Sequence, residues 1–235
     1  MGLAWSFFNP LLMLTIYTFV FSVVFKARWG AGGDGSRAEF ALILFSGLIM
    51  HTLLSECVLR APTLVLGNAN YVKKVVFPLE ILCLVSFGSA LFHALVSVGV
   101  LLIAIVVIKH ALPWTVVLLP VILLPFAIGI LGISWVLAAL GVYVRDIGQV
   151  MGMVMTILMF LTPIFYPVSV LPESFQLWVY LNPLTWVVEQ ARNVLIFGIP
   201  PSLTGWTQSM LVALGLAWFG FWLFQRLRKG FADVL

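Results

Sequence analysis

Long runs without a single charged residue constrain this chain more than any other feature of its sequence. Residues 1–25, 81–108 and 111–144 each lack Asp, Glu, Lys and Arg. A helix needs about 20 apolar residues to cross the hydrocarbon core of a bilayer, and each run provides them. Only 9% of the 235 residues are charged and 63% are hydrophobic, whereas soluble domains carry about 25% charged residues. The sequence therefore predicts an all-α integral membrane protein.

Charged residues and prolines divide the chain into six expected transmembrane helices in a single transmembrane domain, residues 1–235. We expect these helices at residues 5–25, 40–59, 81–108, 113–142, 147–167 and 205–225. The run 111–144 is longer than one crossing needs but too short for two crossings and a turn. We therefore assign it one tilted helix, which Pro120 and Pro125 can kink. The first run lacks the basic start and cleavage site of a signal peptide, so we expect it to be retained.

The apolar stretch from residue 168 to residue 201 is cut by prolines into pieces too short to cross a membrane. Asn182 and Pro183 form a good helix start, because Asn is a preferred N-cap and Pro suits the first helical position. Gly198 suits a helix end. We expect two short re-entrant helices within 172–198, near 172–181 and 183–197, which enter the outer side of the membrane without crossing it.

A polar segment, residues 61–80, separates the second and third expected spans. Its prolines, glycine and asparagines indicate a structured loop with one short helix. Just before it, Glu56 and Arg60 have the i,i+4 spacing that allows an ion pair on one helix face.

Six crossings place both termini on the same side of the membrane. With that side cytoplasmic, seven basic residues fall on inner segments and five on outer segments, in agreement with the positive-inside rule. The inner residues are Arg60, Lys73, Lys74, Arg145, Arg226, Arg228 and Lys229, and the outer residues are Lys26, Arg28, Arg37, Lys109 and Arg192. We therefore expect both termini in the cytoplasm.

The sequence contains no catalytic constellation, so we expect a protein that is not an enzyme. His51, His93 and His110 are isolated, and no two have metal-ligand spacing. The glycine-rich run 30–35 lacks the Lys-Ser/Thr ending of a phosphate-binding loop. We expect no metal, no cofactor and no ATP site in this chain. The basic residues are scattered between apolar runs, which does not indicate a nucleic-acid surface.

Several residues have two interpretations that the sequence leaves open. Glu189 and Arg192, spaced i,i+3 in an apolar segment, either neutralise each other at the outer interface or take part in gating. The aromatic residues Trp135 and Phe160 either line a path on which sugar rings stack or contact lipid.

Four motifs, in order and spacing over essentially the whole chain, add a more specific indication. They are Asn9-Pro10-Leu11-Leu12 with Tyr17-Thr18-Phe19-Val20-Phe21; Asn70-Tyr71-Val72-Lys73-Lys74-Val75-Val76-Phe77-Pro78; Tyr143-Val144-Arg145-Asp146 through Pro163-Ile164-Phe165-Tyr166-Pro167; and Asn182-Pro183-Leu184 with Glu189-Gln190-Ala191-Arg192. The chain resembles the permease subunit of the type-2 ABC transporter family, in the branch that exports O-antigen, capsular polysaccharide and teichoic acid. One departure is that only residues 1–6 precede Phe7, where this family usually has a basic interfacial helix.

The resemblance implies a homodimer in the bacterial inner membrane that works with two copies of a separate ATP-binding subunit, which would bind ATP and Mg²⁺. The implied substrate is a polyprenyl-diphosphate-linked glycan made in the cytoplasm. The resemblance implies coupling to the ATPase through Asn70, Tyr71, Lys73, Lys74, Phe77, Pro78, Arg145 and Asp146. It implies an outer gate that includes Pro163, Tyr166, Asn182, Pro183, Glu189 and Arg192.

The sequence leaves alternatives open for the role of the coupling residues and for the substrate. Lys73 and Lys74 either contact the ATPase or anchor at anionic head groups, and Phe77 is a candidate apolar plug in the ATPase. A type-2 ABC permease for a small drug or lipid is the first alternative function. An ion-driven secondary transporter is the second; it predicts intramembrane carboxylates and inverted repeats, which the sequence does not display.

Overall fold

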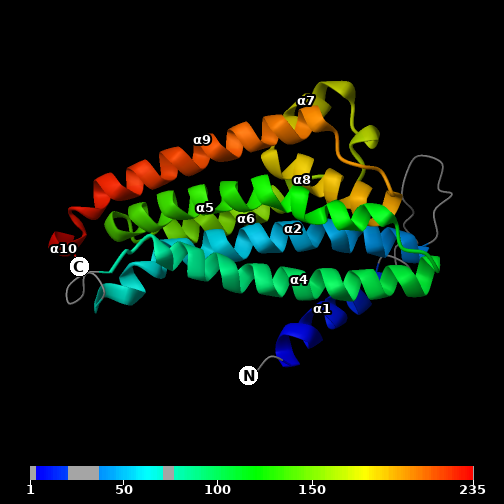
Figure 1. The fold of residues 1–235 in the computed structure, drawn as a ribbon, viewed down its shortest axis with the longest axis horizontal. Helices are drawn as coiled ribbons and strands as arrows, with labels where there is room; N and C mark the ends of the chain where they lie inside the picture. The colour runs from blue at the N-terminus through cyan, green and yellow to red at the C-terminus, as the bar shows by residue number, and fades with distance from the viewer. Residues whose placement is uncertain (1–3, 21–36, 71–76, 235) are drawn as a thin grey trace. The chain divides into compact units, whose positions relative to one another are not determined.

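The computed structural model describes residues 4–20, 37–70 and 77–234, and all regular secondary structure in these ranges is helical (Figure 1). The α-helices are α1 (Ala4–Tyr17), α2 (Arg37–Leu64), α4 (Ile81–Lys109), α5 (Leu119–Tyr143), α6 (Ile147–Leu161), α7 (Glu173–Leu181), α8 (Pro183–Arg192), α9 (Leu203–Arg228) and α10 (Phe231–Val234). Shorter helical segments are η2 (Leu66–Asn68), η3 (Trp114–Leu118), η4 (Val168–Val170) and the π-helical η5 (Asn193–Phe197). The expected all-α class is confirmed.

Among the described residues, four helical segments are long and apolar enough to cross a membrane: Ala38–Leu64, Ile81–Lys109, Trp114–Tyr143 and Leu203–Arg228, with 26 to 30 residues each. At 1.5 Å per residue, a helix of this length spans about 40 Å, more than the roughly 30 Å of hydrocarbon. Two shorter apolar helices, Ser6–Val20 and Ile147–Leu161, accompany them. The structure thus supports four spans by length and composition.

Two of the described helix ends differ from the sequence-based expectation by more than three residues. Helix α2 continues to Leu64, through Pro62, although we expected a loop from residue 61. Ala61, Pro62 and Val65 are buried, and this packing favours the helix although the proline removes one backbone hydrogen bond. Helix α6 ends at Leu161, not near residue 167, because the residue before Pro163 is disfavoured in the α conformation.

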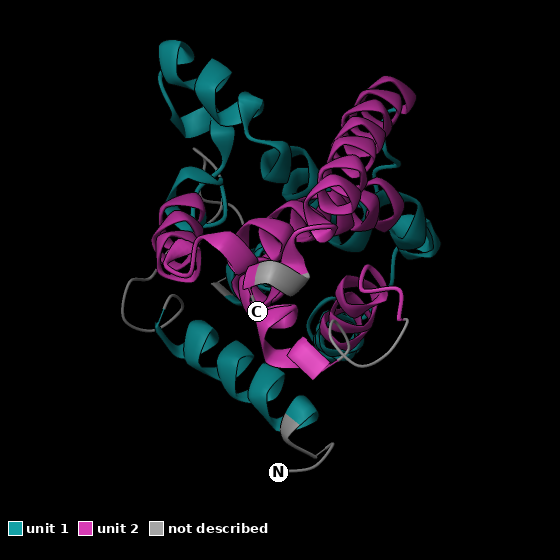
Figure 2. Ribbon diagram, turned by 90° about the vertical axis from the view of Figure 1, so that its left-hand side faces the viewer, with its two compact units in different colours: residues 1–52, 92–122, 159–202 teal, residues 53–91, 123–158, 203–235 magenta. Residues whose placement is uncertain are grey.

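The chain divides into two compact units, coloured separately in Figure 2. Unit 1 comprises residues 1–52, 92–122 and 159–202, and unit 2 comprises residues 53–91, 123–158 and 203–235. One core cluster of unit 1 consists of Phe40, Leu44, Leu48 and Ile164. The core of unit 2 consists of Val65, Leu79, Cys83, Ala138, Ala139, Val142, Phe224 and Phe231.

Close helix contacts in unit 2 are made at glycines that sequence reasoning did not single out. A Cβ atom on Gly132 of α5 would lie 2.6 Å from backbone atoms of Leu216 and Ala217 of α9, and one on Gly220 would collide with the Gly132 carbonyl oxygen. A Cβ on Gly141 would likewise collide with the backbone of Pro62. These glycines therefore allow α5 to pack directly against the backbones of α9 and α2.

The Gly148 and Gly152 pair has the spacing that permits close helix contact. In the structure, however, a Cβ built on either glycine has no described atom within 4 Å. Within the described chain, the tight helix packing is therefore carried by other glycines.

Candidate functional site

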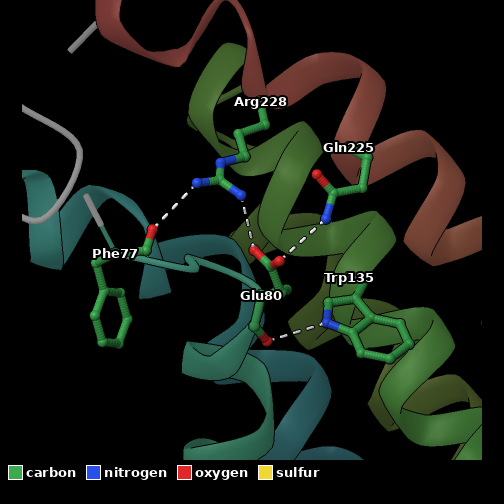
Figure 3. A network of polar contacts seen from close by, with 5 residues as sticks. All are labelled: Phe77, Glu80, Trp135, Gln225 and Arg228. Atoms are coloured by element: carbon green, nitrogen blue, oxygen red, sulfur yellow. Dashed lines mark hydrogen bonds and ion pairs between the residues drawn. The ribbon is translucent and has the colours of Figure 1, made fainter.

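The segment that the resemblance assigns to ATPase coupling, residues 61–80 (the coupling segment), ends in a polar network around Glu80, within unit 2. The Glu80 carboxylate accepts hydrogen bonds from Gln225 Nε2 and from Arg228 Nη1 on α9, both at 3.1 Å. Arg228 Nη2 also donates to the carbonyl oxygen of Phe77 at 3.2 Å, and Trp135 Nε1 on α5 donates to the carbonyl oxygen of Glu80 at 3.2 Å. Figure 3 shows the guanidinium group of Arg228 reaching both Phe77 and Glu80. Three elements far apart in the sequence therefore meet at residue 80.

A tight turn before α4 positions Glu80 for these contacts. The Ile81 amide donates to the carbonyl oxygen of Pro78 at 3.0 Å, and the Leu82 amide donates to that of Leu79 at 3.1 Å. The side chain of Leu79 is buried in the unit 2 core and anchors the turn. Because Glu80 directly precedes the first residue of α4, its negative charge is favourably placed against the helix dipole.

The end of α9 is fixed by further contacts within unit 2. Tyr143 Oη donates to the carbonyl oxygen of Leu227 at 2.9 Å. The Phe231 ring packs edge-on against Phe224 with centroids 5.6 Å apart, and it also contacts the Tyr143 ring. The polar network therefore joins the coupling segment to a well-packed helix end.

Sequence reasoning missed Glu80, Gln225 and Arg228 as interaction partners, because it treated Glu80 only as the end of the polar segment and Arg228 only as a topological charge. A usable signal existed. Glu80 borders a long uncharged run and has no basic residue three or four positions away, so its charge requires a partner that is distant in the sequence.

A cavity of about 460 Å³ lies beside the coupling segment in unit 2. It is lined by Arg60, Leu64, Asn68, Phe77, Leu82, Val85, Ser86 and Ser89. The predicted pair of Arg60 with Glu56 is confirmed at 2.7 Å. The lining combines one cationic side chain with several apolar ones.

The remaining predicted coupling residues are distributed as follows. Tyr71, Lys73 and Lys74 lie outside the described residues. Asn70 and Pro78 are exposed, and so are Arg145 and Asp146 in the turn between α5 and α6. Phe77 is half-buried and packs against the unit 2 core, so its ring already has an intramolecular partner.

The predicted gate region, in unit 1, is organised by the buried side chain of Arg192. Its Nη1 donates to the carbonyl oxygen of Pro163 at 2.6 Å, its Nη2 to that of Ile164 at 2.7 Å, and its Nε to that of Ile43 at 3.2 Å. Arg192 is only 3% exposed. A buried guanidinium is costly unless its donors are paired, and these three carbonyls accept hydrogen bonds from all three of its nitrogen atoms. Arg192 thus ties α8 to the bend after α6 and to α2.

The predicted helix start at Asn182 is confirmed. The Asn182 side chain accepts a hydrogen bond from the Leu184 amide at 3.0 Å, with Pro183 in the first turn. Asn182 Nδ2 also donates to Thr162 Oγ1 at 2.9 Å, which connects the start of α8 to the end of α6. The predicted stop at Gly198 is confirmed too, since Gly198 has φ +71° in the left-handed region.

Glu189 is half-buried on α8. Burial raises the pKa of its carboxyl group, and the positive charge of Arg192 partly opposes that shift. Burial lowers the pKa of Arg192, and Glu189 opposes that change. The two charges therefore stabilise each other electrostatically, while the hydrogen bonds described above direct the Arg192 guanidinium to backbone carbonyls.

The other predicted gate and path residues differ in their surroundings. Pro163 is buried, and Tyr166 Oη donates to the carbonyl oxygen of Phe160 at 3.1 Å. The Phe160 side chain is 63% exposed, and its ring stacks on Phe165. Trp135 is half-buried with its ring edge-on to Phe221, 5.3 Å between centroids. An open aromatic surface is therefore present at Phe160 and not at Trp135.

Four of the described helical segments are long and apolar, and α4, α5 and α9 carry many exposed apolar side chains. These features define a multi-pass helical membrane protein. The sequence profile of the ABC-2 type transporter family matches residues 1–196. The chain belongs to this family, as the motifs had indicated.

Relatives of this chain include two bacterial proteins, each named O-antigen export system permease protein RfbA. That of Klebsiella pneumoniae is 26% identical over 240 residues, covering 100% of this chain and 87% of the relative. That of Myxococcus xanthus is 24% identical over 237 residues, covering 100% of this chain and 88% of the relative.

Proposed function

We propose that this chain is the membrane-spanning permease of an exporter that moves a lipid-linked, O-antigen-like polysaccharide out of the cytoplasm. The observation that carries the proposal is the match along the whole chain to O-antigen export permeases. Members of the ABC-2 family generally work with an ATP-binding subunit and have no ATPase domain of their own. In this proposal two permease copies and two ATPase subunits form the exporter, and the ATPase subunits bind ATP and Mg²⁺.

The proposed topology has six crossings in the bacterial inner membrane, with both termini cytoplasmic. The four long helices account for four crossings, and the helices at Ser6–Val20 and Ile147–Leu161 would begin the other two. Helices α7 and α8, of 9 and 10 residues, are too short to cross and would form the re-entrant outer gate. The positive-inside bias of the sequence supports this orientation.

The proposed mechanism is mechanical. Nucleotide-driven closure of the ATPase subunits would push on residues 61–80, with Lys73 and Lys74 as polar contacts. The push would part a channel between the two permease copies, and the glycan would leave through the α7–α8 region. The exposed positions of Asn70, Arg145 and Asp146 leave them accessible to a partner subunit.

Co-purification tests this proposal. The chain is expressed together with a candidate ABC ATPase subunit, and ATP turnover of the purified complex is measured with and without a polyprenyl-diphosphate-linked glycan. We expect a stable complex whose turnover rises with the glycan. A chain that purifies without an ATPase, or a complex that does not respond to the glycan, would contradict the proposal.

Two other functions give different results in the same assay. A permease for a small drug or lipid would respond to that compound and not to the glycan. An ion-driven transporter would need no ATPase and would respond to an imposed ion gradient. The chain-long similarity to O-antigen permeases favours the glycan.

A further inference from the structure

The network around Glu80 lies where the coupling segment joins the start of α4, within unit 2. The stretch from residue 66 to residue 78 is bracketed by two fully buried core residues, Val65 and Leu79. Two residues after the stretch, the Glu80 carboxylate holds Gln225 and Arg228. A displacement of Glu80 therefore acts directly on the end of α9.

The chemistry of this network favours a role in orienting the turn before α4 rather than in stabilising the fold. The Arg228 and Glu80 side chains are 34% and 20% exposed, and ion pairs with this much solvent access contribute little to stability. The apolar core beneath already secures the helices through Phe224 and Phe231. The planar guanidinium, however, holds the Phe77 carbonyl and the Glu80 carboxylate at once, which fixes the orientation of the turn relative to α9.

Helix α9 is suited to carry such a displacement. It is one continuous helix from Leu203 to Arg228 without an internal proline, so a common cause of helix kinks is missing from it. Its packing against α5 at Gly132 and Gly220 is backbone to backbone. In the chain, α9 follows directly after the segment that contains α7 and α8.

Taking the proposed function as its basis, we infer that Glu80, Gln225 and Arg228 are positioning residues that link the coupling segment to α9. They transmit ATP-driven movement of residues 61–80 to this helix. Loss of the link leaves the ATPase bound to the permease but makes its ATP hydrolysis unproductive.

The test uses the complete permease–ATPase complex in vesicles and the variants Glu80→Gln, Arg228→Gln and the double variant. We expect each to bind the ATPase, while glycan transported per ATP hydrolysed falls about fivefold. The double variant is expected to be no worse than either single one, because all three remove the same contact. Arg228→Lys, which keeps the charge, should recover part of the loss.

Arg226→Gln is the matched control, because Arg226 lies on the same helix end but stacks on Trp222 at 5.5 Å. Variants of Glu80 and Arg228 that behave like this control would overturn the inference. So would losses that add in the double variant, or a melting temperature that falls together with transport, since either would indicate separate or purely structural roles.

A glycan-independent readout separates this inference from the proposed function. Nucleotide binding to the wild-type complex should change amide hydrogen exchange in residues 225–231, and Arg228→Gln should abolish that change. If the wild-type complex fails to transport glycan but shows this change, the proposed substrate is wrong and the link stands. If it transports glycan without this change, the link is wrong and the proposed function stands.

Discussion

Arg192 Nη1 on α8 lies 2.6 Å from the carbonyl oxygen of Pro163, in the bend that follows α6. The same guanidinium binds the carbonyl oxygens of Ile164 and Ile43, so a single side chain contacts three backbone acceptors. The sequence had offered Arg192 as one half of an ion pair with Glu189. The geometry shows in addition that Arg192 holds the backbone around the predicted gate through hydrogen bonds.

Arg192→Ala should therefore destabilise the protein. Unsatisfied buried carbonyl groups cost about 1–3 kcal/mol, and we expect a loss of this order in the free energy of unfolding in detergent micelles. Arg192→Lys should recover only part of it, since one ammonium cannot reproduce the fork of the guanidinium. Arg145→Ala is the matched control, because Arg145 is exposed. Equal stability of the Arg192→Ala and Arg145→Ala variants would show that the three hydrogen bonds are unimportant.

The acid–base behaviour of Glu189 gives a pH prediction. Burial raises the pKa of Glu189 above its ordinary value of 4.5, so the carboxyl group binds its proton more tightly in the folded state than in the unfolded state. Stability from this group is present below pH 4.5 and is lost as the pH rises through the raised pKa. Glu189→Gln should remove this loss of stability at rising pH. Thermal unfolding of the variant and the wild type between pH 4 and pH 8 measures it. Parallel pH curves for the variant and the wild type would contradict this.

The glycine crossing of α5 and α9 predicts a steric effect. Gly132→Ala or Gly220→Ala forces the two backbones apart, and overpacking of this kind costs about 1–3 kcal/mol. Gly215→Ala on the same helix α9 is the control, since a Cβ there meets nothing within 4 Å. The readout is the melting temperature of the purified protein. A Gly132→Ala variant as stable as Gly215→Ala would rule out the close crossing.

Charge reversal tests the predicted ATPase contact. Lys73→Glu combined with Lys74→Glu should weaken co-purification of the ATPase by about tenfold or more, because like charges across an interface cost several kcal/mol. Lys229→Glu, at an exposed position on the predicted inner side, should have little effect. Equal ATPase recovery with both variants would favour the alternative that the two lysines only anchor at lipid head groups.

Local rules predicted much of this fold. The uncharged runs predicted the ends of α4 and α9 to within three residues. The Asn182 and Pro183 pair predicted the start of α8, because capping depends on adjacent residues. The end of α2 was placed too early, since Pro62 reads as a helix breaker until its packing against Gly141 is known.

Long-range partners could not be predicted from one sequence. Glu80 and Arg228 are 148 residues apart, and the acceptors of Arg192 are backbone atoms, which carry no sequence signal. The glycine contacts between α5 and α9 show no local pattern either, whereas the visible Gly148 and Gly152 spacing lies in open space within the described chain. Periodicity and caps report local structure, and these features depend on how distant helices pack.

We propose that this chain is a conduit moved by a separate ATPase. The most direct measurement follows a labelled polyprenyl-diphosphate-linked glycan in vesicles that hold the chain alone, with its ATPase, or with an ATPase unable to hydrolyse ATP. We predict translocation only with the active ATPase and Mg²⁺–ATP. Equal translocation by the chain alone, with or without an ion gradient, would contradict the claim.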